Sequence, residues 1–386
     1  MPSCSAGAAT SNHSSRYDVT QSGQPQTARI AREVFGHLPD GTAIEMVRLR
    51  GEGGFEVRLI TYGAALQSIF VPDRAGRLAD VVLGRDDLAG YLAVRRFLGA
   101  TVGRYANRIA GGTFELDAER FQLPTNDGAN ALHGGLQGFD RKPWTITAMG
   151  EDPAPFVTLS YVSPDGEEGY PGTLKTEITY RISGGSELSI EFSGVTDKPT
   201  IVNLTNHSFF NLAGVESGGD ILNHEVMIAA DTYLPISAAG IPLGAPGRVD
   251  ATPFDFRKSC PVGARLRDAN EQVLIRQGYD HNYCLPGGAT TEPRFAARVE
   301  DPKSGRVLEL WTNQPGVQFY SGNFLDGSVT GKYGRVHRQY DALCLEPQVY
   351  PDTPNRADFP SARLDPGQTY RHTSLYRFSV IKVAGE

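Results

Sequence analysis

Four polar segments of this 386-residue chain carry side chains that could do chemistry. In one of them, residues 203–212 (NLTNHSFFNL), three asparagines, a threonine and a serine surround a single histidine, His207. Desolvated amides need hydrogen-bond partners, so a buried strand rarely carries this many of them. A histidine held by such a network titrates near neutral pH and can donate a proton. The segment therefore favours a catalytic role over a purely structural one.

A second segment is a hydrophobic stretch that contains one acidic residue. Glu346 follows Leu343, Cys344 and Leu345 and precedes Pro347. Burial raises the pKa of a carboxyl group and so makes its anion a stronger base. Taken alone, the segment fits a general base and a salt-bridged structural glutamate equally well.

Two further segments are rich in glycine. Residues 103–112 (GRYANRIAGG) combine an asparagine and two arginines, which could bind hydroxyls or a carboxylate. Residues 126–135 (NDGANALHGG) place His133 before two glycines, which let a ligand approach the backbone closely. A solvated hairpin explains the first segment equally well, and a plain surface turn is the more usual setting for the second.

Two shorter stretches, residues 279–283 (YDHNY) and 315–320 (PGVQFY), are polar at their centres and have aromatic neighbours. Either could be an ordinary loop. His133, His207 and His281 with Asp280 could in principle bind zinc, but none shows a recognised metal-binding spacing. We therefore predict no metal and no cofactor.

Other reaction classes lack their motifs. The chain has no G-x-S-x-G elbow for a serine hydrolase and no glycine-rich phosphate loop. What remains is a set of acids, bases, amides and aromatic rings. Such groups bind a polyhydroxylated ring and move protons on it.

The charge balance limits the partners. Lysine and arginine number 37 against 44 aspartates and glutamates, a formal net charge of −7. This balance argues against nucleic acid or an anionic membrane as partner, because neither would be attracted. No apolar run approaches the roughly 18 residues of a membrane span. We expect a small-molecule partner and a monomer or homodimer.

The elements that must position these groups are mostly strands. Apolar and polar residues alternate over several stretches, and 44 glycines with 25 prolines indicate a chain that turns often. The clearest predicted strands are residues 55–59, 176–182, 188–192, 307–311 and 376–380. Helical candidates are few and short, the best being residues 86–96. No composition break divides residues 30–386, which predicts one large β domain.

The ends and the thiols complete the sequence picture. Residues 1–29 are rich in serine and threonine, which predicts a disordered N-terminal tail. We expect a cytoplasmic location, or a periplasmic one if a signal has been removed. The four cysteines are widely spaced, and we expect free, mostly buried thiols.

Taken together and in order, the motifs resemble the aldose 1-epimerase (galactose mutarotase) family. The similarity runs from about residue 33 to the end of the chain. Any one motif would be weak, but six in register are specific. They are GRYANRIAGG (103–112), NALHGG (130–135), NLTNHSFFNL (203–212), YDHN (279–282), GVQFYSGNF (316–324) and LEPQ (345–348).

The resemblance implies an all-β fold, a large antiparallel β-sandwich with a few short helices. It also implies interconversion of the α and β anomers of free aldoses without a cofactor or metal. By position, His207 would be the general acid and Glu346 the general base. The implied sugar-binding residues are Asn107, Arg108, His133, Asp280 and Gln318. One departure stands out, because the family often has tyrosine where this chain has Phe209.

Three rival functions remain to be tested. A non-catalytic sugar-binding module would need no acid–base pair. A hexose-phosphate epimerase shares the general fold but needs more positive charge than Arg104 and Arg108 offer. A two-carboxylate glycoside hydrolase would need Asp280 and Glu346 at a suitable separation. The sequence does not indicate which sugar is preferred.

Overall fold

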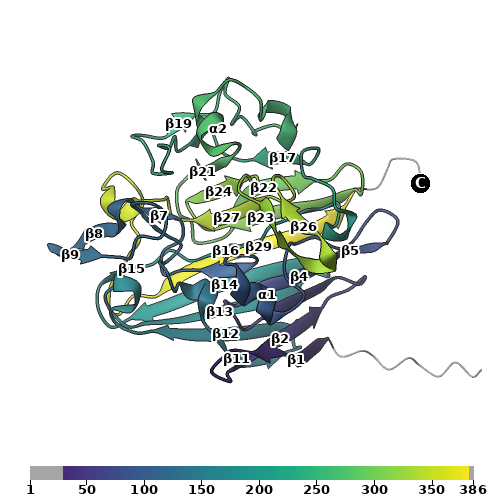
Figure 1. Ribbon diagram of the computed structural model, residues 1–386, viewed down its shortest axis with the longest axis horizontal. Helices are drawn as coiled ribbons and strands as arrows, with labels where there is room; N and C mark the ends of the chain where they lie inside the picture. The colour runs from purple at the N-terminus through teal and green to yellow at the C-terminus, as the bar shows by residue number, and fades with distance from the viewer. Residues whose placement is uncertain (1–28, 382–386) are drawn as a thin grey trace, which may run out of the picture.

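The computed structural model describes residues 29–381. Antiparallel strands dominate this part of the chain, as the alternating patterns predict (Figure 1). Almost all of the predicted tail, residues 1–28, lies outside the described residues. No helix within residues 29–381 is long and apolar enough to cross a membrane.

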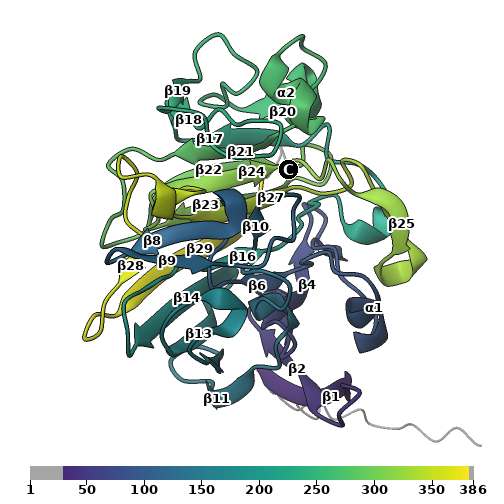
Figure 2. The same ribbon diagram turned by 60° about the vertical axis from the view of Figure 1, so that its left-hand side comes forward.

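The largest sheet within the described residues has nine strands. Its strands alternate buried and exposed side chains, most regularly in β13, so that one face packs into the core. Figure 1 shows most of them side by side across the molecule, and β20 is labelled in Figure 2. In spatial order they are β11 (Thr145–Gly150), β12 (Phe156–Ser163), β13 (Leu174–Ser183), β14 (Glu187–Thr196), β29 (Tyr370–Val380), β23 (Arg306–Thr312), β22 (Arg294–Glu300), β17 (Glu225–Ile228) and β20 (Cys260–Pro261).

Two five-stranded sheets accompany it. The first consists, in order, of β1 (Ile30–His37), β2 (Ala43–Arg50), β3 (Glu56–Ile60), β4 (Ala65–Pro72) and β5 (Leu78–Asp80). The second consists of β19 (Gly247–Arg248), β18 (Thr232–Tyr233), β21 (Asp280–Cys284), β24 (Gly316–Tyr320) and β27 (Cys344–Gln348).

Short strand pairs and helices complete the fold. The pairs are β6 (Ala100–Val102) with β16 (Thr205–His207), β7 (Arg108–Ile109) with β10 (Ala131–Leu132), β8 (Thr113–Leu116) with β9 (Glu119–Gln122), β15 (Thr200–Ile201) with β28 (Arg363–Leu364), and β25 (Asp326–Thr330) with β26 (Val336–Arg338). The α-helices are α1 (Leu88–Ala93) and α2 (Glu271–Arg276). Figure 2 shows α1 and β25 on one side of the molecule and the β8–β9 hairpin on the other.

One large hydrophobic core joins the three sheets. It includes Leu59 of the first sheet, Ile190 of the nine-stranded sheet and Phe319 of the third, all fully buried. Burial of such side chains stabilises the fold by roughly 25 cal/mol per Å² of apolar surface. The sheets therefore form a rigid support for the loops that lie between them.

The sequence predictions for the elements are confirmed with small shifts at their ends. Each of the five predicted strands overlaps one observed strand: β3, β13, β14, β23 or β29. The prediction for β3 is shifted by one residue, and the other four lie inside longer observed strands. The predicted helix at residues 86–96 shortens to α1, where the Asp87 side chain accepts a hydrogen bond from the Gly90 amide and caps the first turn. Within the described residues, Cys260, Cys284 and Cys344 are free thiols, and the last two are buried.

Candidate active site

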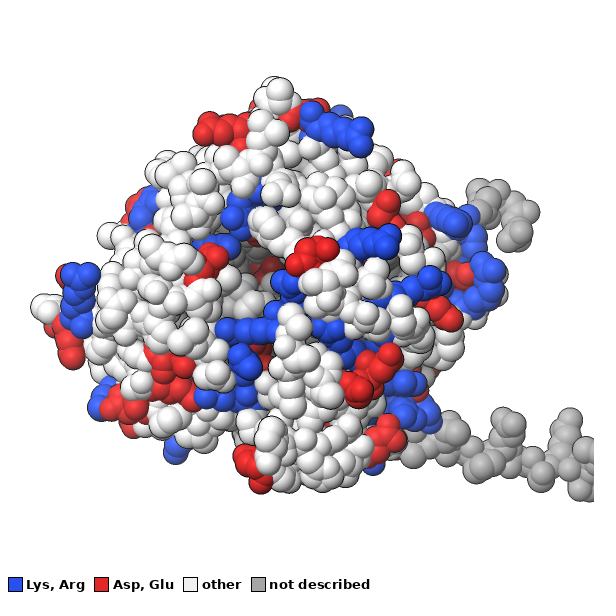
Figure 3. All heavy atoms as spheres, in the orientation of Figure 1, with Lys and Arg blue, Asp and Glu red and all other residues white. Residues whose placement is uncertain are grey.

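A polar pocket of about 380 Å³ opens on the face of the molecule shown in Figure 3. The hollow near the middle of that view lies where β7, β16 and β27 stand in Figure 1. Its polar lining consists of Arg95, Arg96, Asn107, Arg108, Asp127, His133, His207, Arg276, Asp280, Tyr320 and Glu346. Phe97, Leu132, Phe209, Phe324 and Leu325 complete the lining.

His207 is the last residue of β16 and is 5% exposed. The strand is fixed by pairing with β6, where His207 lies opposite Ala100. Its ring stacks between two phenylalanines, with centroid distances of 5.8 Å to Phe97 and 4.9 Å to Phe209. Phe209, the departure from the family pattern, therefore packs directly on the histidine.

The asparagines around His207 support the backbone and make no hydrogen bond to the ring itself. The Asn206 amide donates to the Gly99 carbonyl at 2.8 Å, and Ser208 donates to the Asn206 side chain. Asn203 donates to two backbone carbonyls and accepts from the Val349 amide at 2.9 Å. The amide cluster thus fixes the strand that carries the histidine.

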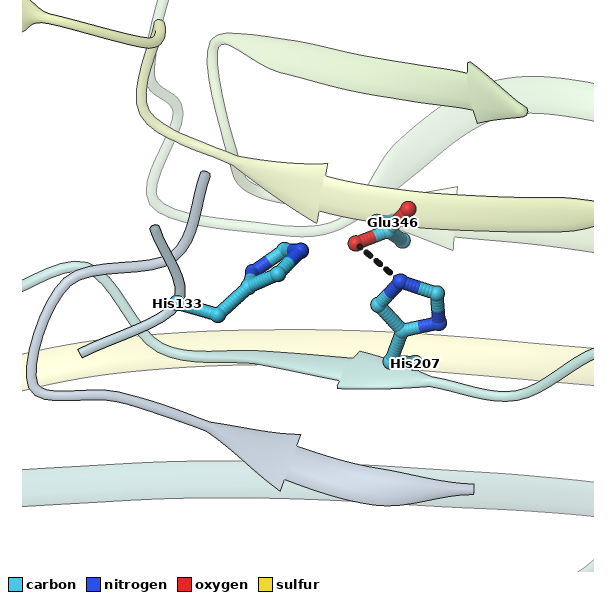
Figure 4. A group of neighbouring side chains, drawn as sticks. All are labelled: His133, His207 and Glu346. Carbon is cyan, nitrogen blue, oxygen red and sulfur yellow. Dashed lines mark ion pairs between the residues drawn. The ribbon is translucent and has the colours of Figure 1, made fainter. Parts of the chain in front are cut away.

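Glu346 projects toward His207 from β27, the edge strand of its sheet. Figure 4 shows the two side chains meeting from different strands. The Nε2 atom of His207 lies 3.6 Å from Oε2 of Glu346, and Oε2 accepts no hydrogen bond from the described residues. An edge position also accommodates the neighbouring Pro347, which cannot donate a ladder hydrogen bond. Both side chains are buried, and Oε2 of Glu346 can still accept a hydrogen bond from a ligand.

Burial disfavours both charges of this pair. It raises the pKa of Glu346 well above its ordinary range, with the nearby Asp280 charge adding to the effect. Burial also lowers the pKa of His207 to about 4, while a contact with its own backbone and the charge of Asp280 act in the opposite direction. Burial therefore favours the neutral pair, with the proton on Glu346 and His207 uncharged, over the ion pair.

His133 and Asn107 face each other from two loops. Both residues have left-handed backbone angles, with φ of 51° and 64°, which is uncommon for side chains other than glycine. The backbone N–H of Asn107 donates to Nδ1 of His133 at 3.2 Å, and the backbone N–H of His133 donates to the backbone carbonyl of Asn107 at 3.0 Å. A neutral His133 must then carry its hydrogen on Nε2, which makes it a donor to a ligand.

This bonding pattern does not favour a metal at the same place. The ligand atoms of His133, His207 and Glu346 lie within 4.8 Å of one another. However, the Nδ1 lone pair of His133 is engaged by a backbone amide and its Nε2 bears hydrogen. A metal-binding imidazole normally offers one nitrogen to the ion and donates from the other. The cluster is better suited to hydrogen bonding.

Asp280 is held as an anion opposite the pair. Arg276 at the end of α2 donates to Oδ2 at 2.5 Å, and the Gln318 amide donates to Oδ1 at 2.8 Å. Burial alone would raise the pKa of Asp280. The charges of Arg276 and Arg108, with the hydrogen bonds from Arg276 and Gln318, outweigh it and lower the pKa. Asp280 therefore carries a negative charge at neutral pH.

All four arginines that line the pocket are paired with carboxylates. Arg95 pairs with Asp140, Arg96 with Asp326, Arg108 with Asp127 and Arg276 with Asp280, at 2.5 to 2.9 Å. Because each guanidinium is neutralised by a neighbour, the pocket has little uncompensated positive charge.

The structure brings six of the seven proposed site residues to the pocket: Asn107, Arg108, His133, His207, Asp280 and Glu346. Gln318 lies behind them and holds Asp280. Arg104, the other arginine of its segment, is 2% exposed and donates to the carbonyls of residues 163, 164 and 171.

Sequence reasoning missed Arg276, Phe97 and Tyr320 as parts of the site. A signal existed for Arg276, which precedes Asp280 by four residues and forms an ion pair with it. Phe97 carries a left-handed φ of 55°, which nothing in its local sequence indicates.

Comparisons with known proteins identify relatives of this chain. The aldose 1-epimerase family model matches residues 45–377. A galactose mutarotase from Rattus norvegicus is 46% identical over 352 residues, covering 91% of this chain and 99% of its own. An aldose 1-epimerase from Escherichia coli is 35% identical, covering 88% and 96%. A crystal structure of galactose 1-epimerase from Lactobacillus acidophilus aligns with a TM-score of 0.80 at 29% identity, covering 92% and 99%.

The antiparallel β architecture and the sequence relatives are those of a mutarotase, an isomerase that acts on sugars. The chain belongs to the aldose 1-epimerase family.

Proposed function

We propose that this aldose 1-epimerase uses His207 as general acid and Glu346 as general base to open and reclose the ring of a free aldose. The observation that carries the proposal is the buried His207–Glu346 pair, 3.6 Å apart, in a polar pocket large enough for a monosaccharide. Glu346 Oε2 accepts no hydrogen bond from residues 29–381, which leaves it available to a sugar hydroxyl.

The reaction needs two proton movements. Glu346 takes the proton of the C1 hydroxyl while His207 gives a proton from Nε2 to the ring oxygen. The C1–O5 bond breaks and leaves an open-chain aldehyde. Rotation about C1–C2 presents the other carbonyl face, and reclosure with reversed proton roles gives the other anomer. Each positioned group contributes roughly 10²- to 10⁴-fold.

The remaining polar groups would hold the sugar during ring opening. His133 donates from Nε2, and the anionic Asp280 accepts from a hydroxyl. Asn107 and Arg108 line the same pocket, and Gln318 acts through Asp280. Positioning of this kind keeps the reacting atoms together while the ring is open. Phe97 and Phe209 offer apolar faces beside the histidine.

A neutral aldose suits the pocket better than a sugar phosphate. All four lining arginines are paired with carboxylates, so a phosphate would have to displace an ion-pair partner. A glycoside hydrolase is disfavoured as well. Both oxygens of Asp280 are occupied by donors, and a second carboxylate that acts as an acid must carry a proton. Galactose and glucose are the first substrates to test.

The test is polarimetry with freshly dissolved α-D-galactose, α-D-glucose and pentoses. We expect mutarotation far above the spontaneous rate, with little competition from a hexose phosphate and no cleavage of an aryl glycoside. A chain that binds these sugars without accelerating mutarotation would be a binding module instead. Strong competition by the phosphate would favour the hexose-phosphate epimerase.

A further inference from the structure

One strand contacts both ring nitrogens of the proposed catalytic histidine. Glu346 and Cys344 are two residues apart on β27, so their side chains project from the same face of the strand. Oε2 of Glu346 lies 3.6 Å from Nε2 of His207, and Sγ of Cys344 lies 3.6 Å from Nδ1. Cys344 is not among the residues that line the pocket.

Cys344 supplies the side-chain partner of Nδ1 of His207. Phe97 and Phe209 cover the two ring faces, and the His133 ring stands edge-on with its centroid 5.2 Å away. The charged groups around the pair are Asp280, which affects His207 and Glu346, and Arg108, which affects Glu346 and His133. Besides this thiol, the backbone of His207 itself contacts the ring and favours its protonated form.

The bond at one imidazole nitrogen decides which nitrogen carries hydrogen. A thiol sulfur is a weak acceptor and a weak donor. Burial raises the pKa of the Cys344 thiol well above its ordinary range, and the charges of Glu346 and Asp280 add to this. The group therefore stays a neutral S–H at neutral pH, with a sulfur lone pair available to an N–H.

Building on the acid–base roles proposed for His207 and Glu346, we propose that Cys344 is a positioning residue whose sulfur accepts the hydrogen on Nδ1 of His207. The ring then keeps Nε2 as the nitrogen that takes a proton from Glu346 and gives it to the ring oxygen. The Nδ1 hydrogen stays in place throughout, so the ring need not turn or change tautomer between steps.

The weakness of the sulfur acceptor also matters. A carboxylate at Nδ1 would stabilise the imidazolium ion and make it a poorer acid. Sulfur orients the ring while leaving the imidazolium acidic, which suits donation to an ether-type oxygen of low basicity. A serine hydroxyl, a stronger acceptor, would orient the ring and raise the pKa of the pair.

The tautomer is measurable by ¹⁵N NMR on the full-length labelled protein without sugar, with His207→Asn to assign the signals. We expect the neutral His207 ring to carry its hydrogen on Nδ1, with Nε2 in the unprotonated range. A ring with hydrogen on Nε2 would overturn the proposal. This readout does not depend on the chain being an epimerase.

Kinetics supply the second test. We expect Cys344→Ala to lower kcat by about tenfold with KM within about twofold, since ring orientation and not sugar binding is lost. Cys344→Ser should keep kcat within about threefold of the parent and move the alkaline limb of the pH profile to higher pH. Cys284→Ala removes another buried thiol of the same sheet and should leave kcat unchanged.

Equal kcat values for Cys344→Ala and Cys284→Ala would overturn the proposal. An equal loss in Cys344→Ala and Cys344→Ser with unmoved pH limbs would mean that the thiol only fills space, and would overturn it too. Absence of mutarotation in the parent chain would instead defeat the proposed function, and the NMR result would still decide the role of Cys344.

Discussion

His207 and Glu346 lie where neither charge is favoured, and this governs how they share a proton. Burial lowers the pKa of His207 and raises that of Glu346, so the neutral pair and the ion pair differ only in the position of one proton. Losing that proton at high pH removes the acid, and gaining a second at low pH removes the base. A bell-shaped pH profile follows, whose limbs belong to the pair.

Asp280 should tune this profile. Its fixed negative charge raises the pKa of both Glu346 and His207. We predict that Asp280→Asn shifts the alkaline limb of kcat/KM to lower pH and raises KM about tenfold, because Arg276 loses its partner and the sugar loses an acceptor. Initial-rate polarimetry from pH 5 to 9 measures both effects.

Asp250→Asn is the matched control, since Asp250 is an exposed carboxylate paired with Arg248 and Arg257 outside the pocket. An Asp280→Asn profile that superimposes on that of Asp250→Asn would contradict the assigned role.

At the scale of elements, the site is formed by loops whose backbones adopt unusual angles and lie in close contact with one another. Phe97, Asn107 and His133 all adopt left-handed angles, which cost of order 1–3 kcal/mol each and persist only because the surrounding structure enforces them. Gly134 shows how tight the fit is. A Cβ atom there would lie 1.8 Å from the Gly103 carbonyl oxygen, so this loop meets the Gly103–Asn107 segment backbone to backbone.

Gly134→Ala should therefore displace His133. We expect kcat/KM to fall at least about tenfold and the free energy of unfolding to fall by about 2 kcal/mol. Gly41→Ala is the control, because Gly41 has a similar φ (88° against 82°) but no atom within 4 Å of an added Cβ. Mutarotation rates and urea unfolding of both variants provide the comparison. Equal effects would show that backbone angle, and not the close approach, matters at Gly134.

Strands and loops differ in how far the sequence predicts them. Alternation locates β13 and β14 because one face of each strand is buried. The left-handed angles at Phe97 and His133 come from contacts with distant segments, which no local pattern encodes. Likewise, residue types mark Glu346 and His207 as candidates, but only the pairing of β16 and β27 with different neighbours brings the two together.

At the scale of the whole molecule, buried histidines couple stability to pH. Burial lowers the pKa of His207, His224 and His337 to about 4 and that of His281 and His372 to about 3, and His133 shifts the same way. Three of them accept backbone N–H bonds, which a protonated ring nitrogen cannot do.

The sign follows from these shifts. The histidines of the unfolded chain bind protons near pH 6.5 and those of the folded chain only at lower pH, so their contribution is fully present above pH 6.5 and falls as pH drops. The raised pKa values of four carboxyl groups, Glu346, Asp140, Asp341 and Asp352, act in the opposite direction, but these groups are fewer than the six histidines. We predict that the free energy of unfolding is lower at pH 5 than at pH 7 by at least about 2 kcal/mol. Urea unfolding at the two pH values measures it, and equal values would contradict the prediction.

The central claim is that one buried acid–base pair carries the reaction, and a single comparison tests it most directly. The rate of mutarotation of fresh α-D-galactose is followed by polarimetry for the parent, His207→Asn and Glu346→Gln, with sugar binding measured calorimetrically on the same samples. We predict that each variant loses at least about 10²-fold in kcat while its dissociation constant stays within about tenfold. A variant that binds the sugar and exchanges its anomers within a few-fold of the parent would contradict the account.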